Sequence, residues 1–284
     1  MPTHSVKSPR FTGKKVVVTG AASGLGRALA VAFAREGADL VIADVNEEGL
    51  GETAEMVKAA GGGCMARRVD VSSREQVERF ADEVLRDRGR VDILVNNAGV
   101  GVGGELKDVP LDDFEWIVGI NLMGVVYGTR CFLPHMVEMG DGHIVNVGSL
   151  SGHVVLPLHI PYTTTKFGIT GFTEALWAEC RCHGIDVTLV CPGAMRTNIM
   201  ATTRVYQAGG GGFGGKWQRL LEQGGMEPEQ AAEIVLRAVD KKRFLVFTGA
   251  LPYFFYYLKR LSPALYRRIL VPATRIYSRG GGAS

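Results

Sequence analysis

Residues 14–26 read KKVVVTGAASGLG, an apolar run that leads directly into a glycine-rich loop. The β-branched residues of this run predict a buried strand, and apolar residues at helical spacing from Leu25 to Phe33 predict a helix after it. Glycines between a strand and a helix let the backbone turn tightly and approach a pyrophosphate, which the N–H groups of the helix N-terminus can bind. The stretch therefore predicts a phosphate-binding turn at the start of an α/β fold.

The alternation of strand and helix continues along the chain. Six further short apolar runs predict strands, with helical patterns between them, at residues 38–43, 64–69, 91–95, 143–147, 186–190 and 244–248. Strands that are apolar throughout and joined by helices indicate a parallel sheet covered on both faces. We predict an α/β, doubly wound, Rossmann-like fold, with a single domain over residues 10–250 and an aromatic and basic C-terminal helical extension over residues 251–284.

Composition and charge limit the classes of function. The 284 residues are 46% hydrophobic and 21% charged, which supplies enough apolar material for a core and excludes disorder of the whole chain. The net charge is +3, but residues 237–279 contain ten basic residues and one acid. A near-neutral body with a basic end argues against a nucleic-acid partner and leaves an anionic membrane surface open as a local partner.

Five cysteines, an odd number without a CxxC pair, predict free thiols in a reducing compartment and hence a cytoplasmic protein. No group of cysteine and histidine has the spacing of a metal site. The first residues lack the apolar segment of a signal peptide, and the longest apolar run, residues 244–258, is shorter than the about 20 residues of a membrane-spanning helix. We therefore expect no metal and no transmembrane helix.

Acidic residues after two of the predicted strands indicate which nucleotide the turn would bind. Asp44 ends the second strand, eighteen residues after Gly26, where a carboxylate can accept both hydroxyls of the adenosine ribose and would repel a 2′-phosphate. Neither the loop nor the next position carries an Arg or Lys that could pair with such a phosphate. This favours NAD over NADP, with a simple turn-capping role for Asp44 as the alternative. Asp70 and Val71, after the third strand, could contact the adenine.

A tyrosine and a lysine are spaced for shared chemistry. Tyr162 and Lys166 are four residues apart, so on a helix they lie on one face. A nearby ammonium favours the phenolate, and we expect it to lower the pKa of the tyrosine from about 10 toward the working pH, as acid–base catalysis requires. Ser149, thirteen residues upstream and just past a predicted strand, could hydrogen-bond a substrate carbonyl or hydroxyl.

Taken together, these residues resemble the short-chain dehydrogenase/reductase family. The resemblance covers roughly residues 12–250, and the motifs occur in the family's order. They are the TGxxxGxG loop at Thr19–Gly26, NNAG at Asn96–Gly99, the helix asparagine at Asn121, the serine at Ser149, YxxxK at Tyr162 and Lys166, PG at Pro192 and Gly193, and Thr197 where the family contacts the nicotinamide carboxamide. Enoyl reductases of the family space the tyrosine and lysine more widely, so the resemblance argues against that activity.

The resemblance implies a role for each catalytic residue. Tyr162 is implied as the general acid and base, and Lys166 as the residue that tunes it and binds the nicotinamide ribose. Ser149 would orient the substrate oxygen and stabilise charge on it, and Asn121 would hold a water that relays protons toward Lys166. The predicted cofactor contacts are Gly20, Ser23, Gly24, Leu25, Gly26, Asp44, Asp70, Val71, Asn97, Ala98, Gly99, Tyr162, Lys166, Pro192, Gly193 and Thr197.

The predicted substrate side is mainly apolar. It comprises the segment between Ser149 and Tyr162 and a lid after Pro192. The residues predicted to line it are Ser149, His153, Leu156, Met195 and Ile199. This lining favours a hydrophobic alcohol or ketone, of steroid, retinoid or other lipid-like type, over a small acid or a sugar. Two alternatives stay open: His153 could bond only local partners, and the apolar lid residues could serve packing.

The C-terminal extension combines aromatic and aliphatic residues with cations. Residues 254–268 read FFYYLKRLSPALYRR, and Ser262-Pro263 is typical of an N-cap followed by the first residue of a second helix. An amphipathic segment of this kind could lie in a membrane interface, where substrate would enter from lipid. The alternative is that it packs over the pocket or against a second subunit.

We therefore predict an NAD-dependent oxidoreductase that transfers a hydride between the nicotinamide and a hydrophobic secondary alcohol or ketone. The resemblance also implies a homo-oligomer. Three alternatives remain: an NADPH-dependent ketone reductase, a dinucleotide-sensing regulator without turnover, and a membrane-surface binding module. The complete set of Asn121, Ser149, Tyr162 and Lys166 argues against a sensor, which needs no proton donor.

Overall fold

A parallel sheet of seven strands forms the centre of the computed structural model, which describes residues 9–196, 202–206 and 224–279. The strands lie in the order β3-β2-β1-β4-β6-β7-β9. Their bounds are β1 (Lys15–Thr19), β2 (Asp39–Asp44), β3 (Cys64–Arg68), β4 (Ile93–Asn96), β6 (Gly142–Val147), β7 (Ile185–Pro192) and β9 (Leu245–Thr248). All seven predicted strands are confirmed, with ends that differ by a few residues.

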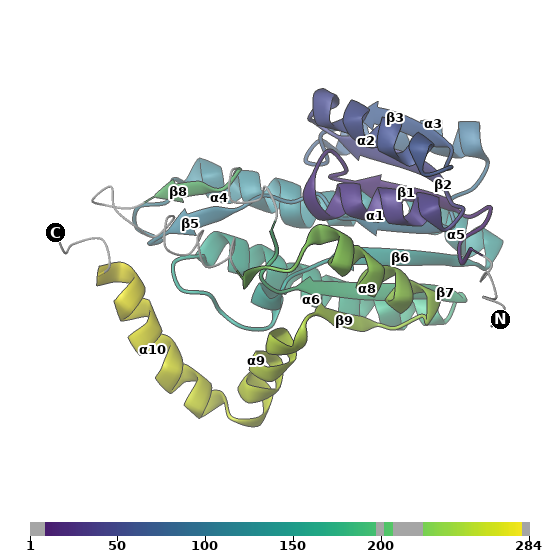
Figure 1. Ribbon diagram of the computed structural model, residues 1–284. Helices are drawn as coiled ribbons and strands as arrows, with labels where there is room; N and C mark the ends of the chain where they lie inside the picture. The colour runs from purple at the N-terminus through teal and green to yellow at the C-terminus, as the bar shows by residue number, and fades with distance from the viewer. Residues whose placement is uncertain (1–8, 197–201, 207–223, 280–284) are drawn as a thin grey trace, which may run out of the picture.

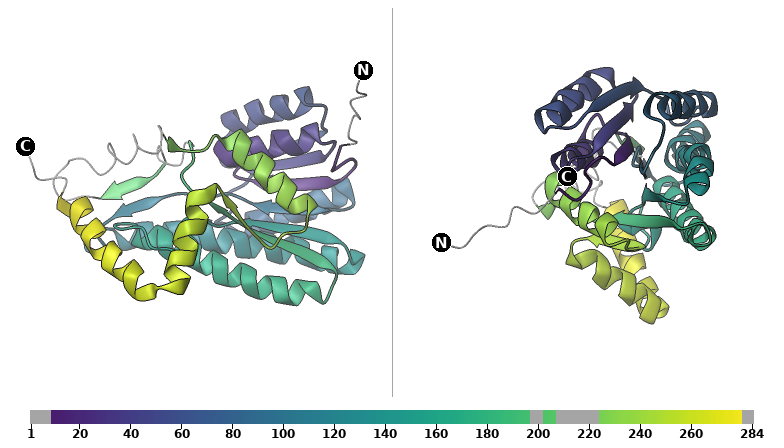
Figure 2. Two further views of the ribbon diagram at one scale, coloured as in Figure 1. Left: turned by 60° about the horizontal axis from the view of Figure 1, so that its bottom comes forward. Right: turned by 90° about the vertical axis from the view of Figure 1, so that its right-hand side faces the viewer.

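Helices cover both faces of this sheet, and the end-on view in Figure 2 shows the sheet between two helical layers. One layer consists of α1 (Gly24–Arg35), α2 (Glu47–Ala59) and α8 (Pro228–Asp240). The other consists of α3 (Arg74–Arg88), α5 (Gly124–Met139) and α6 (Ile160–Arg181). The predicted doubly wound, Rossmann-like fold is therefore confirmed (Figure 1).

The apolar strands follow from this double cover. Side chains alternate between the two faces of a strand, so in β1 Val16 and Val18 enter the core beside α1 and α8, while Val17 enters the core beside α3 and α5. All three side chains are fully buried. A strand with only one buried face would carry polar residues at every second position, and β1 does not.

Local signals begin and end several helices. Asn46 caps α2 by accepting a hydrogen bond from the Gly49 N–H, and Ser73 caps α3 by accepting one from Gln76. Gly89 ends α3 with a φ of 72°, a left-handed conformation that glycine adopts without steric cost. These caps fix where the helices start relative to the strand ends.

Two features beyond the main sheet were not predicted. The strands β5 (Val102–Gly104) and β8 (Arg204–Tyr206) pair in a small parallel sheet next to α4 (Leu111–Val118), beyond one end of the main sheet (Figure 1). The second feature is a π-helical turn at Gly119–Met123, which joins α4 to α5. Segments far apart in sequence make the small sheet, so short-range patterns do not reveal it.

The helical run Leu111–Met139 is, among the described residues, the one helix long and apolar enough to cross a membrane by length and composition. Within this run Ile117, Phe132 and Met136 are almost completely buried in the protein core. Its apolar character is therefore explained by packing in the fold.

The C-terminal extension forms two helices, as predicted: α9 (Ala250–Leu261) and α10 (Pro263–Arg279). They form a V that leaves the body after β9, the strand at one edge of the main sheet (Figure 1). In both figures α10 lies at the same end of the molecule as β5 and β8. The division into a domain of residues 10–250 and an extension of residues 251–284 stays a prediction.

Candidate active site

The glycine-rich loop between β1 and α1 is a close crossing of backbones. Gly20 has a φ of +66°, and a Cβ on it would lie 2.6 Å from the Ala98 Cα. A Cβ on Gly26 would lie 2.0 Å from the Gly20 carbonyl oxygen. Asn97 locks this arrangement because its Nδ2 donates to the carbonyl oxygens of Thr19 at 2.9 Å and Gly20 at 3.0 Å. No larger residue fits at Gly20 or Gly26 without moving backbone.

The loop fits the phosphates of a dinucleotide. The N-cap of α1, Ser23, makes no side-chain capping bond, and no acidic residue stands in the first turn of the helix. The N–H groups of Gly24, Leu25 and Gly26 therefore point out of a helix end that carries a partial positive charge. Such a terminus, approached only by glycine backbone, is suited to a pyrophosphate.

Asp44 and Asp70 both bind nearby backbone. The Asp44 Oδ2 accepts from the Ala22 N–H at 2.9 Å and its Oδ1 from the Asn46 N–H at 3.0 Å, so the turn-capping alternative describes its contacts within the chain. Each carboxylate oxygen has a second lone pair, and the half-buried side chain keeps acceptor capacity for a ribose. The Asp70 Oδ1 accepts from the N–H and the hydroxyl of Ser72. The nucleotide contacts of both residues stay predictions.

Three of the predicted catalytic residues come together at the end of β6. Ser149 follows that strand, and Tyr162 and Lys166 lie on one face of α6. The Ser149 hydroxyl lies close enough to the Tyr162 phenol to favour its ionised form, and it accepts a hydrogen bond from the Ser151 N–H at 3.1 Å. The Lys166 Nζ lies 5.5 Å from the centroid of the Tyr162 ring. The structure therefore brings together a hydroxyl, a phenol and an ammonium.

Lys166 is a buried cation without a carboxylate partner in the part of the chain that the structure describes. Its side chain is enclosed, with 4% of the residue exposed, and its Nζ donates to the Val147 carbonyl oxygen at 3.0 Å. Burial lowers the pKa of Lys166 from 10.5 to about 8. An ammonium has three hydrogens, so two remain available to a hydroxyl-bearing ligand.

The prediction that Lys166 lowers the pKa of Tyr162 is wrong. Burial raises the pKa of this phenol above its usual value, and the opposing effect is that of the nearby Ser149 hydroxyl. The physical reason is that the partly buried ring packs against the buried apolar cluster of Val102, Val109 and Ile117, which disfavours the phenolate. Tyr162 therefore keeps its proton at neutral pH.

Asn121 lies in the π-helical turn and is completely buried. Its Oδ1 accepts from the Val100 N–H at 2.8 Å, and its Nδ2 donates to the Val100 carbonyl oxygen at 3.0 Å and to the Thr165 hydroxyl at 3.2 Å. Both amide hydrogens thus have protein partners, and Asn121 connects the loop after β4 to α6. Its role in holding a relay water stays a prediction.

Of the predicted substrate residues, His153 has local partners. Its Nε2 lies 3.3 Å from the Cys191 Sγ, and its ring packs edge-on against Phe247 and Tyr256. Burial first, and the nearby Arg260 and Lys259 second, lower the pKa of His153 to about 4, so it is neutral at pH 7. The alternative of a loop histidine with local partners describes these contacts.

The other predicted residues on this side are placed differently. Leu156 is half-buried in the loop before α6, and Met195 packs against the core beside α1 and α8 and pairs by backbone with Met226. Pro192 ends β7, and the Gly193 N–H donates to the Thr248 hydroxyl at 3.3 Å. Thr197 and Ile199 lie outside the described residues.

Both C-terminal helices contact the substrate loop, which we define as residues 150–159. The Tyr266 hydroxyl of α10 accepts from the Val155 N–H at 2.6 Å and donates to the Val155 carbonyl oxygen at 3.2 Å. The Lys259 Nζ of α9 donates to the His153 carbonyl oxygen. The sequence pointed to packing over the pocket as one alternative, but nothing in it singled out Tyr266 or Lys259, because these contacts join residues more than a hundred positions apart.

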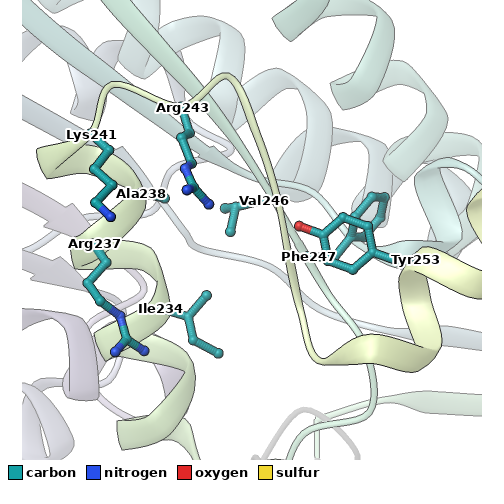
Figure 3. A pocket seen from close by; sticks show the side chains of 8 residues that line it. All are labelled: Ile234, Arg237, Ala238, Lys241, Arg243, Val246, Phe247 and Tyr253. Atoms are coloured by element: carbon teal, nitrogen blue, oxygen red, sulfur yellow. The ribbon is translucent and has the colours of Figure 1, made fainter.

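A separate pocket of about 250 Å³ lies beside the edge strand β9, between α8 and α9 (Figure 3). Its lining residues are Ile234, Arg237, Ala238, Lys241, Arg243, Val246, Phe247 and Tyr253. None of the predicted catalytic, cofactor or substrate residues lines it. The pocket is therefore distinct from the site around Tyr162.

The model of the short chain dehydrogenase family matches residues 14–207, and the chain belongs to this family.

Three relatives show the range of the family around this chain. It is 38% identical over 263 residues to the Mycobacterium tuberculosis protein named as the oxidoreductase EphD, over 90% of this chain and 44% of EphD. It is 36% identical to the protein named as the oxidoreductase SadH of the same organism, over 92% of this chain and 95% of SadH. It is 34% identical to epidermal retinol dehydrogenase 2 of Mus musculus, over 92% and 82%. The chain thus spans less than half of the length of EphD.

Solved structures agree in fold and differ in cofactor. A short-chain dehydrogenase/reductase from Burkholderia phymatum, in complex with NAD, is 33% identical with a TM-score of 0.83, over 90% of this chain and 96% of that one. A metagenomic short-chain oxidoreductase in complex with NADP is 29% identical with a TM-score of 0.70, over 85% and 100%. The two neighbours therefore hold nicotinamide dinucleotides that differ in the 2′-phosphate.

We expect Lys166→Met to stabilise the protein at neutral pH by about 2 kcal/mol while removing turnover. A fall in pKa from 10.5 to about 8 means that burying the ammonium costs about 3 kcal/mol of folding free energy, which the variant no longer bears. The variant also loses the hydrogen bond to Val147, which stabilises the wild type by about 1 kcal/mol, so the net gain is about 2 kcal/mol. Below pH 8 the ammonium is charged in both the folded and the unfolded state, so the full cost is present. Between about pH 8 and 10.5 only the folded state has lost the proton, and the cost disappears.

Urea unfolding of the wild type and Lys166→Met at neutral pH and near pH 10 measures this difference. The advantage of the variant should shrink at the higher pH. A variant that is less stable at neutral pH, or an advantage independent of pH, would contradict the cost of the buried ammonium.

We expect Tyr266→Phe to loosen the substrate loop. Without the hydroxyl, the Val155 N–H and carbonyl lose their partner, at about 1 kcal/mol for each bond. The KM for a hydrophobic substrate should rise about fivefold or more with a smaller change in kcat, and the Val155 amide should exchange hydrogen faster. Tyr253→Phe on α9, whose hydroxyl has no bond to this loop, is the control. Unchanged KM and unchanged exchange would show that α10 does not hold the loop.

Proposed function

We propose that the protein is an NAD-dependent dehydrogenase or reductase that interconverts a hydrophobic secondary alcohol and its ketone. The observation that carries the proposal is the group of Ser149, Tyr162 and Lys166, in which a phenol that keeps its proton at neutral pH lies near a hydroxyl and a buried ammonium. When bound, the nicotinamide cofactor supplies or accepts the hydride. The protein contributes position and a proton.

Each side chain of the group has a separate task. The Tyr162 hydroxyl gives its proton to the substrate oxygen in reduction and removes it in oxidation. Because burial raises the pKa of Tyr162, the residue is a proton donor at neutral pH, which favours reduction there and oxidation at higher pH. Ser149 holds the substrate oxygen against the phenol. Lys166, when charged, stabilises the phenolate and offers its remaining hydrogens to the ribose hydroxyls.

The choice of NAD rests on Asp44. Its carboxylate stands at the end of β2 beside the loop, where a 2′-phosphate would bring further negative charge. The cation nearest in the register of the sheet is Arg68, which lies opposite Asp44. Arg68 already forms an ion pair with Glu47 at 3.3 Å, so its charge is partly neutralised by a carboxylate of the chain itself. An NADPH-dependent ketone reductase is the second candidate, supported by the proton-donating state of Tyr162 and by the relative in complex with NADP.

A hydrophobic substrate is supported by what surrounds the phenol. Tyr162 packs against the buried cluster of Val102, Val109 and Ile117, and Trp116 of α4 and Tyr206 of β8 pack against the same cluster. Leu156 and Val154 in the substrate loop add apolar surface. The similarity to a retinol dehydrogenase points the same way. The predicted lining by Met195 and Ile199 is part of the same proposal.

We further propose a cytoplasmic homo-oligomer. The described cysteines, Cys64, Cys131, Cys180, Cys182 and Cys191, are all free thiols, which suits a reducing compartment. Oligomerisation is supported by family resemblance alone.

We expect Tyr162→Phe to lower kcat by about 10²- to 10⁴-fold, the usual contribution of a positioned acid or base, without loss of NADH binding. The assay follows the formation or consumption of NADH with a series of secondary alcohols and ketones whose apolar groups increase in size. We expect kcat/KM to rise as the apolar group becomes larger. Tyr127→Phe, which changes a partly buried tyrosine of α5 in the same way, is the control. Wild-type turnover in Tyr162→Phe would overturn the proposal, and NADH binding without any turnover would favour a dinucleotide-sensing regulator.

A further inference from the structure

The helices α9 and α10 expose several large apolar side chains. Leu261 is 83% exposed, Leu251 65% and Phe254 60%. We define the hairpin face as these residues together with Tyr257, Leu265, Ile269 and Val271. Exposed apolar residues scattered singly are ordinary, but the seven of the hairpin face lie within 21 residues, which is a local concentration of exposed apolar surface.

Helix α10 has little contact with the rest of the protein. Among residues 263–272, whose side chains the structure describes, Tyr266 is the one buried residue. Figures 1 and 2 show α10 at an angle to α9 and away from the main sheet. A helix gains most of its stability in a protein by packing an apolar face, so the face of α10 that the described residues leave unpacked is suited to a partner.

The charge of this segment is of one sign. Residues 244–284 contain six basic residues and no acid. Arg267 and Arg268 are exposed beside Leu265 and Ile269, and Arg260 lies over the Tyr256 ring at 4.9 Å. A second copy of the hairpin face would therefore meet it with like charge, whereas an anionic surface would be attracted.

The pocket beside β9 extends the positive charge toward α8. Figure 3 shows Arg237, Lys241 and Arg243 on one side of it and Tyr253 of α9 on the other. None of these three cations forms an ion pair within the described residues. Cations at the C-terminal end of α8 also suit the dipole of that helix, so on their own they would indicate little. Beside the hairpin face they add to a basic surface that continues past Tyr253.

We propose that the hairpin face binds the surface of a membrane that contains anionic lipids. The apolar side chains would enter the boundary between headgroups and acyl chains, and the cations would lie among the phosphates. The inner side of the same helices holds the substrate loop through Lys259 and Tyr266, so the bound enzyme presents that loop near the lipid. The proposal does not rest on the catalytic one, because lipid binding needs neither cofactor nor substrate.

Sedimentation of the full-length protein with vesicles tests the proposal. Vesicles of phosphatidylcholine mixed with phosphatidylglycerol should bind the protein, vesicles of phosphatidylcholine alone should bind it much more weakly, and high salt should release it. Equal binding to both kinds of vesicle, or binding to neither, would overturn the proposal.

Two matched pairs of variants separate the apolar and the ionic contributions. Phe254→Ser with Leu261→Ser should weaken binding more than about tenfold, whereas Leu106→Ser with Leu111→Ser, also exposed but outside the hairpin face, should not. Arg267→Gln with Arg268→Gln should weaken binding about 25-fold, since about 1 kcal/mol per cation is about fivefold. Arg35→Gln with Arg79→Gln, exposed arginines of α1 and α3, is the charge control.

Light scattering of the same variants tests whether a second copy of the chain, instead of a membrane, covers the hairpin face. If the hairpin face were an interface between two copies, Phe254→Ser with Leu261→Ser would lower the molar mass in solution and leave vesicle binding unchanged. That result would overturn the proposal. The variants should unfold at the same temperature as the wild type. A loss of vesicle binding then results from the changed surface side chains and not from a less stable fold.

Discussion

The close crossing of two backbones at Gly20 and Gly26 is the constraint on which the site depends. With a Cβ of Gly26 only 2.0 Å from the Gly20 oxygen, β1 can pass into α1 only through glycine. Asn97 fastens that turn to the end of β4 with two hydrogen bonds. The positive end of α1 is thereby aimed at the edge of the sheet where Ser149 and α6 meet. A phosphate-binding turn and a proton-transferring group thus share one edge of the sheet.

The second constraint is the burial of Lys166. An ammonium held by one carbonyl oxygen costs folding free energy, and it persists because other elements hold α6 in place. Asn121, in its π-helical turn, joins Thr165 on α6 to the backbone of Val100. Such turns are frequent at functional sites, and here the irregular turn places a buried amide where a regular helix would not. The burial of Lys166 therefore lowers the stability of the fold and leaves two hydrogens of its ammonium available to a ligand.

Much of the fold could be predicted from the sequence because its signals are local. Apolar strands, glycine stops and the loop at residues 14–26 each depend on neighbouring residues, and all seven strands of the main sheet were found. The β5–β8 pair, the π-helical turn and the bond from Tyr266 to Val155 depend on contacts across the chain, which periodicity does not encode. The pKa of Tyr162 was misjudged for the same reason: spacing identified the nearby ammonium, but not the apolar enclosure that outweighs it.

The most direct test of the account is a titration of the purified protein with NADH and, separately, with NADPH, followed by nicotinamide fluorescence. We expect both to bind at the glycine loop and NADH to bind more tightly, because the Asp44 carboxylate repels a 2′-phosphate. Tighter binding of NADPH would contradict the role given to Asp44 and direct attention to ketone reduction. Binding of neither would contradict the phosphate-binding turn itself, and with it the function built on Tyr162 and Lys166.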